Sequence, residues 1–253
     1  MNFLAQLKQR NQSLYWFGWL NILSAIISII MIMVDDTIVL GINAWIKPLK
    51  FFLSTFIFSW TMGWFMHHLT KQKAVTVFSW VVIVVLLFEN IVITWQAANG
   101  RLSHFNISDP FYLLLFNLMG VAITIMTLWT LYIGILFFRQ KNFNLPAKYV
   151  WAIRIAILFF VIFAFEGGIM AAQLKHSVGA ADGTEGLPLF NWSKVHGDLR
   201  VAHFIGMHSL QIIPLFGWFI AKTKMQVLVF SAVYLLLVLF LLWQALKGIP
   251  LFS

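Results

Sequence analysis

Seven stretches of this chain are each long and apolar enough to cross the hydrocarbon core of a lipid bilayer as a helix. A core about 30 Å thick requires about 20 predominantly apolar residues in helical conformation. The stretches comprise residues 14–34, 49–69, 74–97, 111–138, 147–171, 199–221 and 224–247. They predict an all-α integral membrane protein, a bundle of about seven transmembrane helices that forms a single domain over residues 1–253.

The composition supports a membrane location and excludes several kinds of site. Charged residues make up 10% of the chain, whereas a soluble domain has about 25%. The chain has no cysteine, which excludes disulfides, thiolate metal ligands and a cysteine nucleophile. The net charge of +9 is spread over short loops, so it indicates membrane topology, with the lipid bilayer as partner and no nucleic acid.

The charges in the loops predict an orientation. With a cytoplasmic N-terminus, nine lysines and arginines fall in inner loops and seven in outer loops, which favours an N-in, C-out topology. Six of the eight acidic residues then fall on the outer side, and Glu89 and Glu166 lie in the outer halves of their helices. The polar chemistry is therefore expected at the outer (extracytoplasmic) face.

One segment at the start of the sixth apolar stretch gathers ionisable and amide side chains at a depth where each is costly: His196, Asp198, Arg200, His203, His208 and Gln211. Helical geometry makes His208 and Gln211 close neighbours and places Arg200 on the same broad face. His203 and His208 lie about 140° apart around the helix, so each requires a partner from another helix to bind a metal ion. Hydrogen bonding that only fixes helix packing is the alternative, whereas Asp198 is expected as the N-cap of the helix.

Two acidic residues inside apolar stretches are candidates for chemistry. Glu89 and Glu166 each require a cation or several donors, or else bind a proton. We expect Glu89, Glu166 and His208 as catalytic residues, in the role of general base, proton carrier or metal ligand. Structural ion pairs are the alternative.

Outer cations and histidines complete the predicted site. Lys50, Arg101, Arg200 and Gln211 are the expected ligands of an anionic or lipid-like small molecule, and His104, His203 and His208 the expected metal ligands. The stretch 173–198 is long for a connection in a compact bundle, which is typical of a lid or binding loop.

Residues 173–211 resemble a pattern found in uncharacterised bacterial multi-pass membrane proteins. The resemblance lies in Gly-Asp-Leu-Arg at 197–200, followed by His203-Phe204, Gly206, His208 and Leu210-Gln211. His-Ser-Val-Gly at 176–179 and Gly-Leu-Pro at 186–188 precede it. The resemblance implies a location in the bacterial inner membrane and implies no activity.

Three hypotheses on function follow. The first is a metal-dependent or redox membrane enzyme, a hydrolase or oxidoreductase with zinc or iron held by imidazole and carboxylate. Its architecture resembles membrane hydrolases of the ceramidase and adiponectin-receptor type, although their His-x-x-x-His spacing does not occur here. The second is a proton-coupled transporter or ligand-binding membrane protein, and the third a haem- or quinone-binding protein with His208 as an axial ligand.

Overall fold

The computed structural model describes residues 2–252, and this part of the chain is all-helical apart from two short strand pairs. It contains eight helices, which account for 72% of the residues. The chain forms two compact units, residues 1–129 and 130–253, and the boundary between them falls inside one continuous helix, α5 (Pro110–Arg139). The single domain predicted over residues 1–253 stays a prediction.

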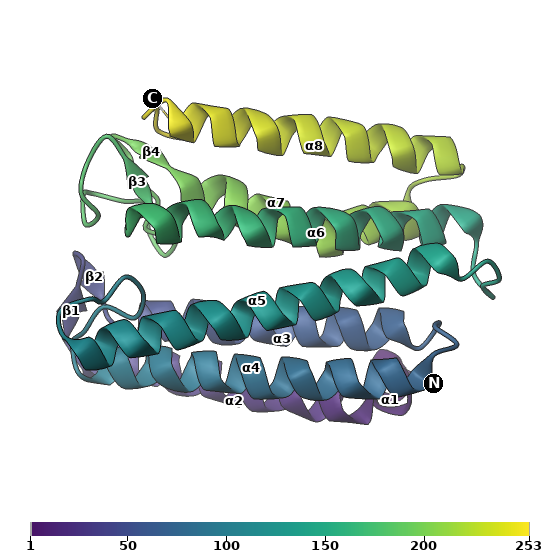
Figure 1. The fold of residues 1–253 in the computed structure, drawn as a ribbon, viewed down its shortest axis with the longest axis horizontal. Helices are drawn as coiled ribbons and strands as arrows, with labels where there is room; N and C mark the ends of the chain where they lie inside the picture. The colour runs from purple at the N-terminus through teal and green to yellow at the C-terminus, as the bar shows by residue number, and fades with distance from the viewer. Residues whose placement is uncertain (1, 253) are drawn as a thin grey trace. The chain divides into compact units, whose positions relative to one another are not determined.

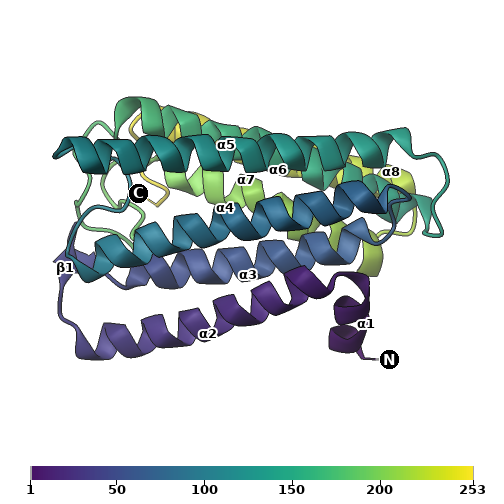
Figure 2. The same cartoon turned by 60° about the horizontal axis from the view of Figure 1, so that its bottom comes forward.

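Unit 1 is built from a short helix followed by long helices that run side by side (Figures 1 and 2). The elements are α1 (Phe3–Arg10), α2 (Gln12–Val34), α3 (Ile46–Met66), α4 (Gln72–Ala98) and the first part of α5. Asn11 separates α1 from α2, since its side chain accepts a hydrogen bond from the Leu14 amide and caps α2. A hairpin of β1 (Ile38–Val39) and β2 (Ile42–Asn43) joins α2 to α3.

Unit 2 contains the end of α5 and three further long helices. They are α6 (Ala147–Gln173), α7 (Leu199–Phe219) and α8 (Lys224–Leu246). The connection from α6 to α7 carries β3 (Ser177–Val178), which pairs antiparallel with β4 (Gly197–Asp198) immediately before α7. The strand pair therefore closes the stretch 173–198 into a loop at the start of α7.

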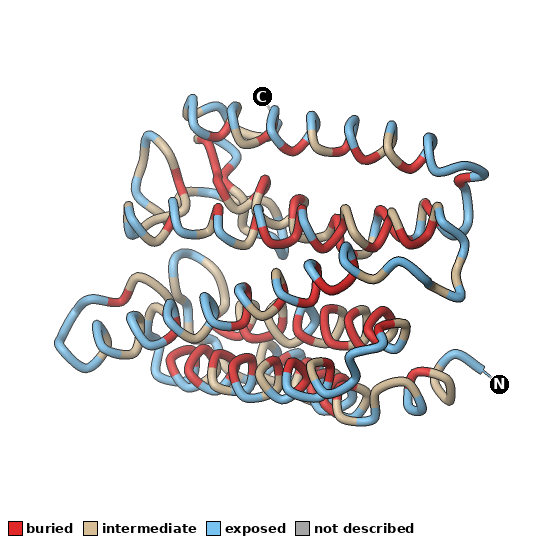
Figure 3. The backbone as a smooth tube through the Cα atoms, turned by 45° about the vertical axis from the view of Figure 1, so that its right-hand side comes forward, coloured by how far each residue is buried: buried red, intermediate tan, exposed pale blue. Residues whose placement is uncertain are grey.

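Helices α6 and α7 have the most extensive packing in unit 2. Each helix has buried residues along most of its length (Figure 3). Glycine makes part of this close approach possible. A Cβ atom on Gly206 of α7 would lie 2.2 Å from the ring of Phe163 on α6, so only glycine fits at this position. Phe163 is itself 1% exposed, which places this contact in the core of the unit.

Each predicted apolar stretch coincides with one of the long helices, with ends that differ by at most three residues. Five of these helices have the length and hydropathy of membrane spans, namely α2, α4, α5, α6 and α8, so the chain has the properties of a multi-pass membrane protein. Helices α3 and α7 are equally helical but less apolar, because α3 carries Lys47 and Lys50 and α7 carries Arg200 and two histidines. Seven spans and the N-in, C-out orientation remain predictions.

Candidate functional site

A carboxyl–imidazole pair links the two best-packed helices of unit 2. The Nδ1 atom of His203 on α7 lies 3.1 Å from Oε2 of Glu166 on α6, so the two side chains share a hydrogen bond. The side chain of Glu166 is 4% exposed and that of His203 is 24% exposed. Glu166 lies seven residues before the end of α6, about 10 Å along the helix axis. The pair therefore joins a deeply buried acid to a partly accessible base.

The local sequence of α6 makes room for this pair. Phe163 and Met170, one turn to either side of Glu166, are both buried, so the acid belongs to the face of α6 that packs inside the unit. The next residue, Gly167, has no side chain, and a Cβ atom there would lie 2.9 Å from Cε1 of His203. Any larger residue at position 167 would push the imidazole ring away from its present place.

Glu166 retains an unused acceptor. Its second carboxyl oxygen, Oε1, is buried and has no hydrogen-bond partner in the described part of the chain. A buried oxygen of this kind is costly unless a donor, a water molecule or a proton satisfies it. The arrangement can therefore bind a proton at Glu166 and exchange it with the imidazole of His203.

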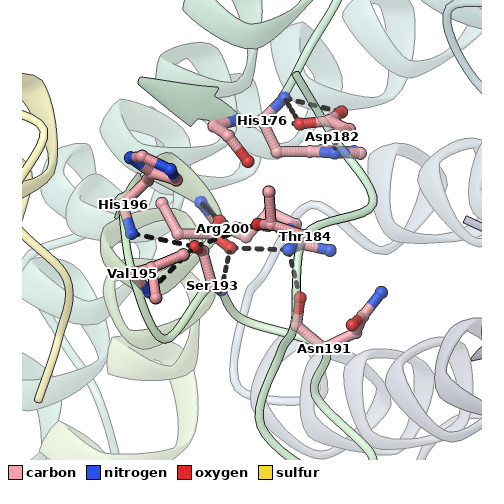
Figure 4. A network of polar contacts seen from close by, with 10 residues as sticks. His176, Asp182, Thr184, Asn191, Ser193, Val195, His196 and Arg200 are labelled. Atoms are coloured by element: carbon pink, nitrogen blue, oxygen red, sulfur yellow. Dashed lines mark hydrogen bonds and ion pairs between the residues drawn. The ribbon is translucent and has the colours of Figure 1, made fainter. Parts of the chain in front are cut away.

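The loop between α6 and α7 is fastened at the start of α7 (Figure 4). Asp198 caps α7 by accepting hydrogen bonds from the amide of Arg200 (3.0 Å) and its Nε atom (2.9 Å), while its other oxygen accepts from the amide of Ser193 (2.9 Å). The guanidinium of Arg200 also donates to the carbonyl oxygen of Asn191. Arg200, which we expected to bind substrate, is thus engaged in holding the loop.

A second fastening lies near the beginning of the loop, where the imidazole of His176 pairs with the carboxylate of Asp182 at 2.6 Å (Figure 4). The other oxygen of Asp182 accepts hydrogen bonds from the amides of His176 (3.0 Å) and Ser177 (2.9 Å). Burial acts to raise the pKa of Asp182, but the hydrogen bonds and the charge of His176 outweigh it and hold the pKa well below its usual range. The loop is therefore closed at both of its ends.

The second predicted pair on α7 also forms. His208 Nδ1 lies 3.1 Å from Oε1 of Gln211, and the ring of Phe204 packs edge-on against the imidazole with 4.3 Å between centroids. Phe204 in turn contacts Phe190 and Trp192 of the loop. His208 thus lies beside an aromatic cluster formed by the loop and α7, while His203 pairs with α6.

Unit 1 holds the remaining predicted site residues. Glu89 on α4 is 4% exposed, and the positive charge of Lys47 on α3 acts on it. Lys50 lies in the second turn of α3. In the loop after α4, Arg101 lies 5.9 Å from the centre of the Tyr112 ring, and His104 packs against Phe51. The roles predicted for these residues are not tested by their positions.

Metal-ligand geometry differs from the expectation. Within residues 2–252, no three histidine, aspartate or glutamate side chains lie close enough together to share a metal ion. Of the predicted ligands, His203 and His208 point to different partners, and His104 belongs to unit 1. The structure thus gives no support to a zinc or iron site with three protein ligands, and the predicted haem site stays a prediction.

Two features were missed by the analysis of the sequence. One is the space for His203 that Gly167 provides. The other is a buried network in unit 1, where the amide of Asn90 on α4 donates to Asn21 on α2 (2.9 Å) and Thr55 on α3 (3.2 Å). The signal available was an amide or hydroxyl side chain inside each of three apolar helices, since such residues bond to one another inside a bundle.

The fold defines the class of the molecule as a multi-pass helical membrane protein with a buried acid–imidazole pair. No protein-family model, curated protein or solved structure matches this chain. What the molecule does must therefore be inferred from its own residues.

Proposed function

We propose that this chain is a proton-coupled membrane protein, a transporter or ligand-binding protein in which the Glu166–His203 pair takes up and releases a proton. The observation that carries the proposal is the 3.1 Å contact between a carboxyl group and an imidazole inside a membrane-spanning bundle. Ionisable groups at such depth usually serve ion or proton pathways, because their burial is costly. The unpartnered Oε1 of Glu166 supports the same role, since a protonated carboxyl group satisfies it.

The two members of the pair have different parts in the proposed reaction. Glu166, the more deeply buried, holds the proton when the pair is neutral overall. His203, which is more exposed, passes the proton to and from the aqueous side through its imidazole ring. We propose that the ligand is a small anionic or lipid-like molecule that approaches from the outer face, where the sequence predicts the polar chemistry of the chain.

Of the three functional classes expected from the sequence, an enzyme with a zinc or iron ion held by three protein ligands receives less support. Such a site requires three ligand side chains around one ion, whereas the Glu166–His203 site brings together one carboxyl group and one imidazole. Metal analysis by mass spectrometry of the purified protein and of His203→Ala and His208→Ala separates these classes. Stoichiometric zinc, copper or iron that the variants lose would favour the enzyme and contradict the proton-coupled proposal.

The direct test of the proposal is a titration of Glu166. The chain has three glutamates, at positions 89, 166 and 185, so labelling glutamate with carbon-13 at the side-chain carboxyl gives three signals that Glu→Gln variants assign. We record spectra of protein reconstituted into lipid between about pH 4 and 9, and we expect the Glu166 signal to respond to pH because the pair takes up and releases a proton. It should shift when His203 is replaced by glutamine. A Glu166 signal that is constant over this range would contradict the proposal.

Transport is tested in the same lipid vesicles. We expect an inward pH gradient to drive uptake of at least one solute from a panel of phosphate, lactate, glycine and ethanolamine phosphate. Uptake should fall at least about tenfold in Glu166→Gln, because the proton carrier is lost. Glu185→Gln is the matched control, since Glu185 is an exposed loop residue paired with Lys194. Equal uptake by wild type and Glu166→Gln would show that transport does not use this pair.

A further inference from the structure

A buried hydrogen-bond network fixes the face of α4 beside Glu89. Both amide hydrogens of Asn90 are used, one by Asn21 on α2 and one by Thr55 on α3. Asn21 donates its own amide hydrogen to the carbonyl oxygen of Phe17 (2.7 Å). All three polar side chains are at least nine-tenths buried, so the network sets the rotation of α4 against α2 and α3.

One carboxyl oxygen of the neighbouring residue Glu89 lacks a hydrogen-bond donor. Within residues 2–252, its Oε1 atom is buried and has no hydrogen-bond partner, and the same is true of Oδ1 of Asn90. Two adjacent residues of one helix thus present buried acceptors with no donor assigned to them. Ionised carboxylates inside proteins are normally paired or held by several hydrogen bonds.

The charges around Glu89 come from α3. Lys47 acts on the carboxyl group electrostatically, and Lys50 lies one turn further along the same helix. Helix α2 has no charged residue, and α5 has none before its last residue, Arg139. The carboxyl group therefore has a cation in its surroundings but no hydrogen-bond donor at Oε1.

We infer that Glu89 is a second proton-binding site of this chain, whose carboxyl group holds a proton in the folded protein at neutral pH. A bound proton removes the uncompensated charge and supplies a donor where the site otherwise contains acceptors. The site lies in unit 1 and rests on different residues from the Glu166–His203 pair, so it stands whether or not the proposed function is correct. The positive charge of Lys47 opposes the proton, which makes its release responsive to that lysine.

The glutamate-labelled protein tests this inference with a separate signal. At about pH 7 in lipid, we expect the wild type to show a protonated glutamic acid signal that disappears in Glu89→Gln and persists in Glu185→Gln. In Lys47→Gln, the protonated signal should persist at pH 7, because removal of a nearby positive charge favours the protonated acid. An ionised Glu89 at neutral pH would overturn the inference.

Two further measurements test the protonation of Glu89, the first of them even if Glu89→Gln does not fold. If Glu89→Gln does not fold, the signals of Glu166 and Glu185 are assigned with their own variants, and the remaining wild-type signal belongs to Glu89. The melting temperature is also compared in sodium and choline chloride. A sodium-dependent increase that Glu89→Gln abolishes would identify the site as a metal-cation site and would overturn the proton assignment. No sodium effect is expected.

Discussion

Asp182 shows how one carboxylate can stabilise the loop between α6 and α7. Its pKa in the folded protein is depressed, so its contribution to stability is fully present above the unfolded value of about 3.9. The contribution is lost as the pH falls through the folded pKa. Loop closure by this residue is therefore expected to be constant from neutral pH down to about pH 4 and to weaken only in stronger acid.

Substitution of Asp182 by alanine should open the loop at every pH. Hydrogen bonds to a charged acceptor contribute about 1.5–3 kcal/mol each, so we expect amide exchange of residues 176–182 to become at least about tenfold faster. Hydrogen exchange read by mass spectrometry measures this effect. Glu185→Ala is the control, since it removes an exposed ion pair and should leave exchange unchanged within a factor of about two.

Arg200 provides a test of two roles for one side chain. It was predicted to bind substrate, yet its guanidinium contacts Asp198 and the carbonyl oxygen of Asn191. Arg200→Lys should lose the two-pronged contact with Asp198 and destabilise the loop, with faster exchange around Asn191. The titration of Glu166 should be unchanged. If Arg200→Lys alters the Glu166 titration while amide exchange of the loop stays normal, Arg200 acts at the Glu166–His203 site, as the sequence predicted.

At the scale of the helices, two adjacent glycines of α6 test whether the close approach of α6 to His203 on α7 is required. One of them, Gly167, lies against His203, and the other, Gly168, serves as its control. A Cβ atom at Gly167 meets His203 at 2.9 Å, whereas one at Gly168 meets nothing within 4 Å. Alanine stabilises a helix interior by up to about 1 kcal/mol relative to glycine at either position. Gly168→Ala should therefore raise the melting temperature and leave the Glu166 titration unchanged. Gly167→Ala should shift the titration because it displaces the imidazole, and identical behaviour of both variants would contradict this account.

Hydropathy was sufficient to predict the long helices but not their contacts. The stretch 147–171 became α6 (Ala147–Gln173) because its apolar residues determine both its environment and its helical state. Helical periodicity cannot say which neighbouring helix a buried residue meets, so the contact of Glu166 with His203 was not predicted from the sequence. The pairing of Asp198 with Arg200 is easier to predict from the sequence, since the two residues are only two positions apart.

At the scale of the whole molecule, the number of spans depends on the two most polar long helices. We expect α3 and α7 to cross the membrane with the five more apolar ones, because each is 21 residues long. The chain has no cysteine, so single cysteines introduced at Leu40, Lys71, Lys194 and Lys222 report topology without background. In intact cells, a membrane-impermeant maleimide should label positions 40 and 194 but not 71 and 222.

The controls for this labelling are permeabilised cells, in which all four positions should react. Labelling of 40 and 71 on the same side would show that α3 does not cross, and labelling of 194 and 222 on the same side would show the same for α7. The reverse pattern, with 71 and 222 labelled from outside, would contradict the N-in orientation predicted from the loop charges.

The fastened loop before α7 also imposes an order on biosynthesis. His176 and Asp182 lie six residues apart, so their pair can close soon after both have been synthesised. The strand pair between Ser177 and Asp198 can form only after Asp198 has been synthesised. The contact of Asn191 likewise requires Arg200. At about 5–20 residues per second, a ribosome takes roughly one to four seconds to synthesise the intervening chain. Until then, the loop is fastened by the His176–Asp182 pair alone, and its contacts to the start of α7 are the last to form.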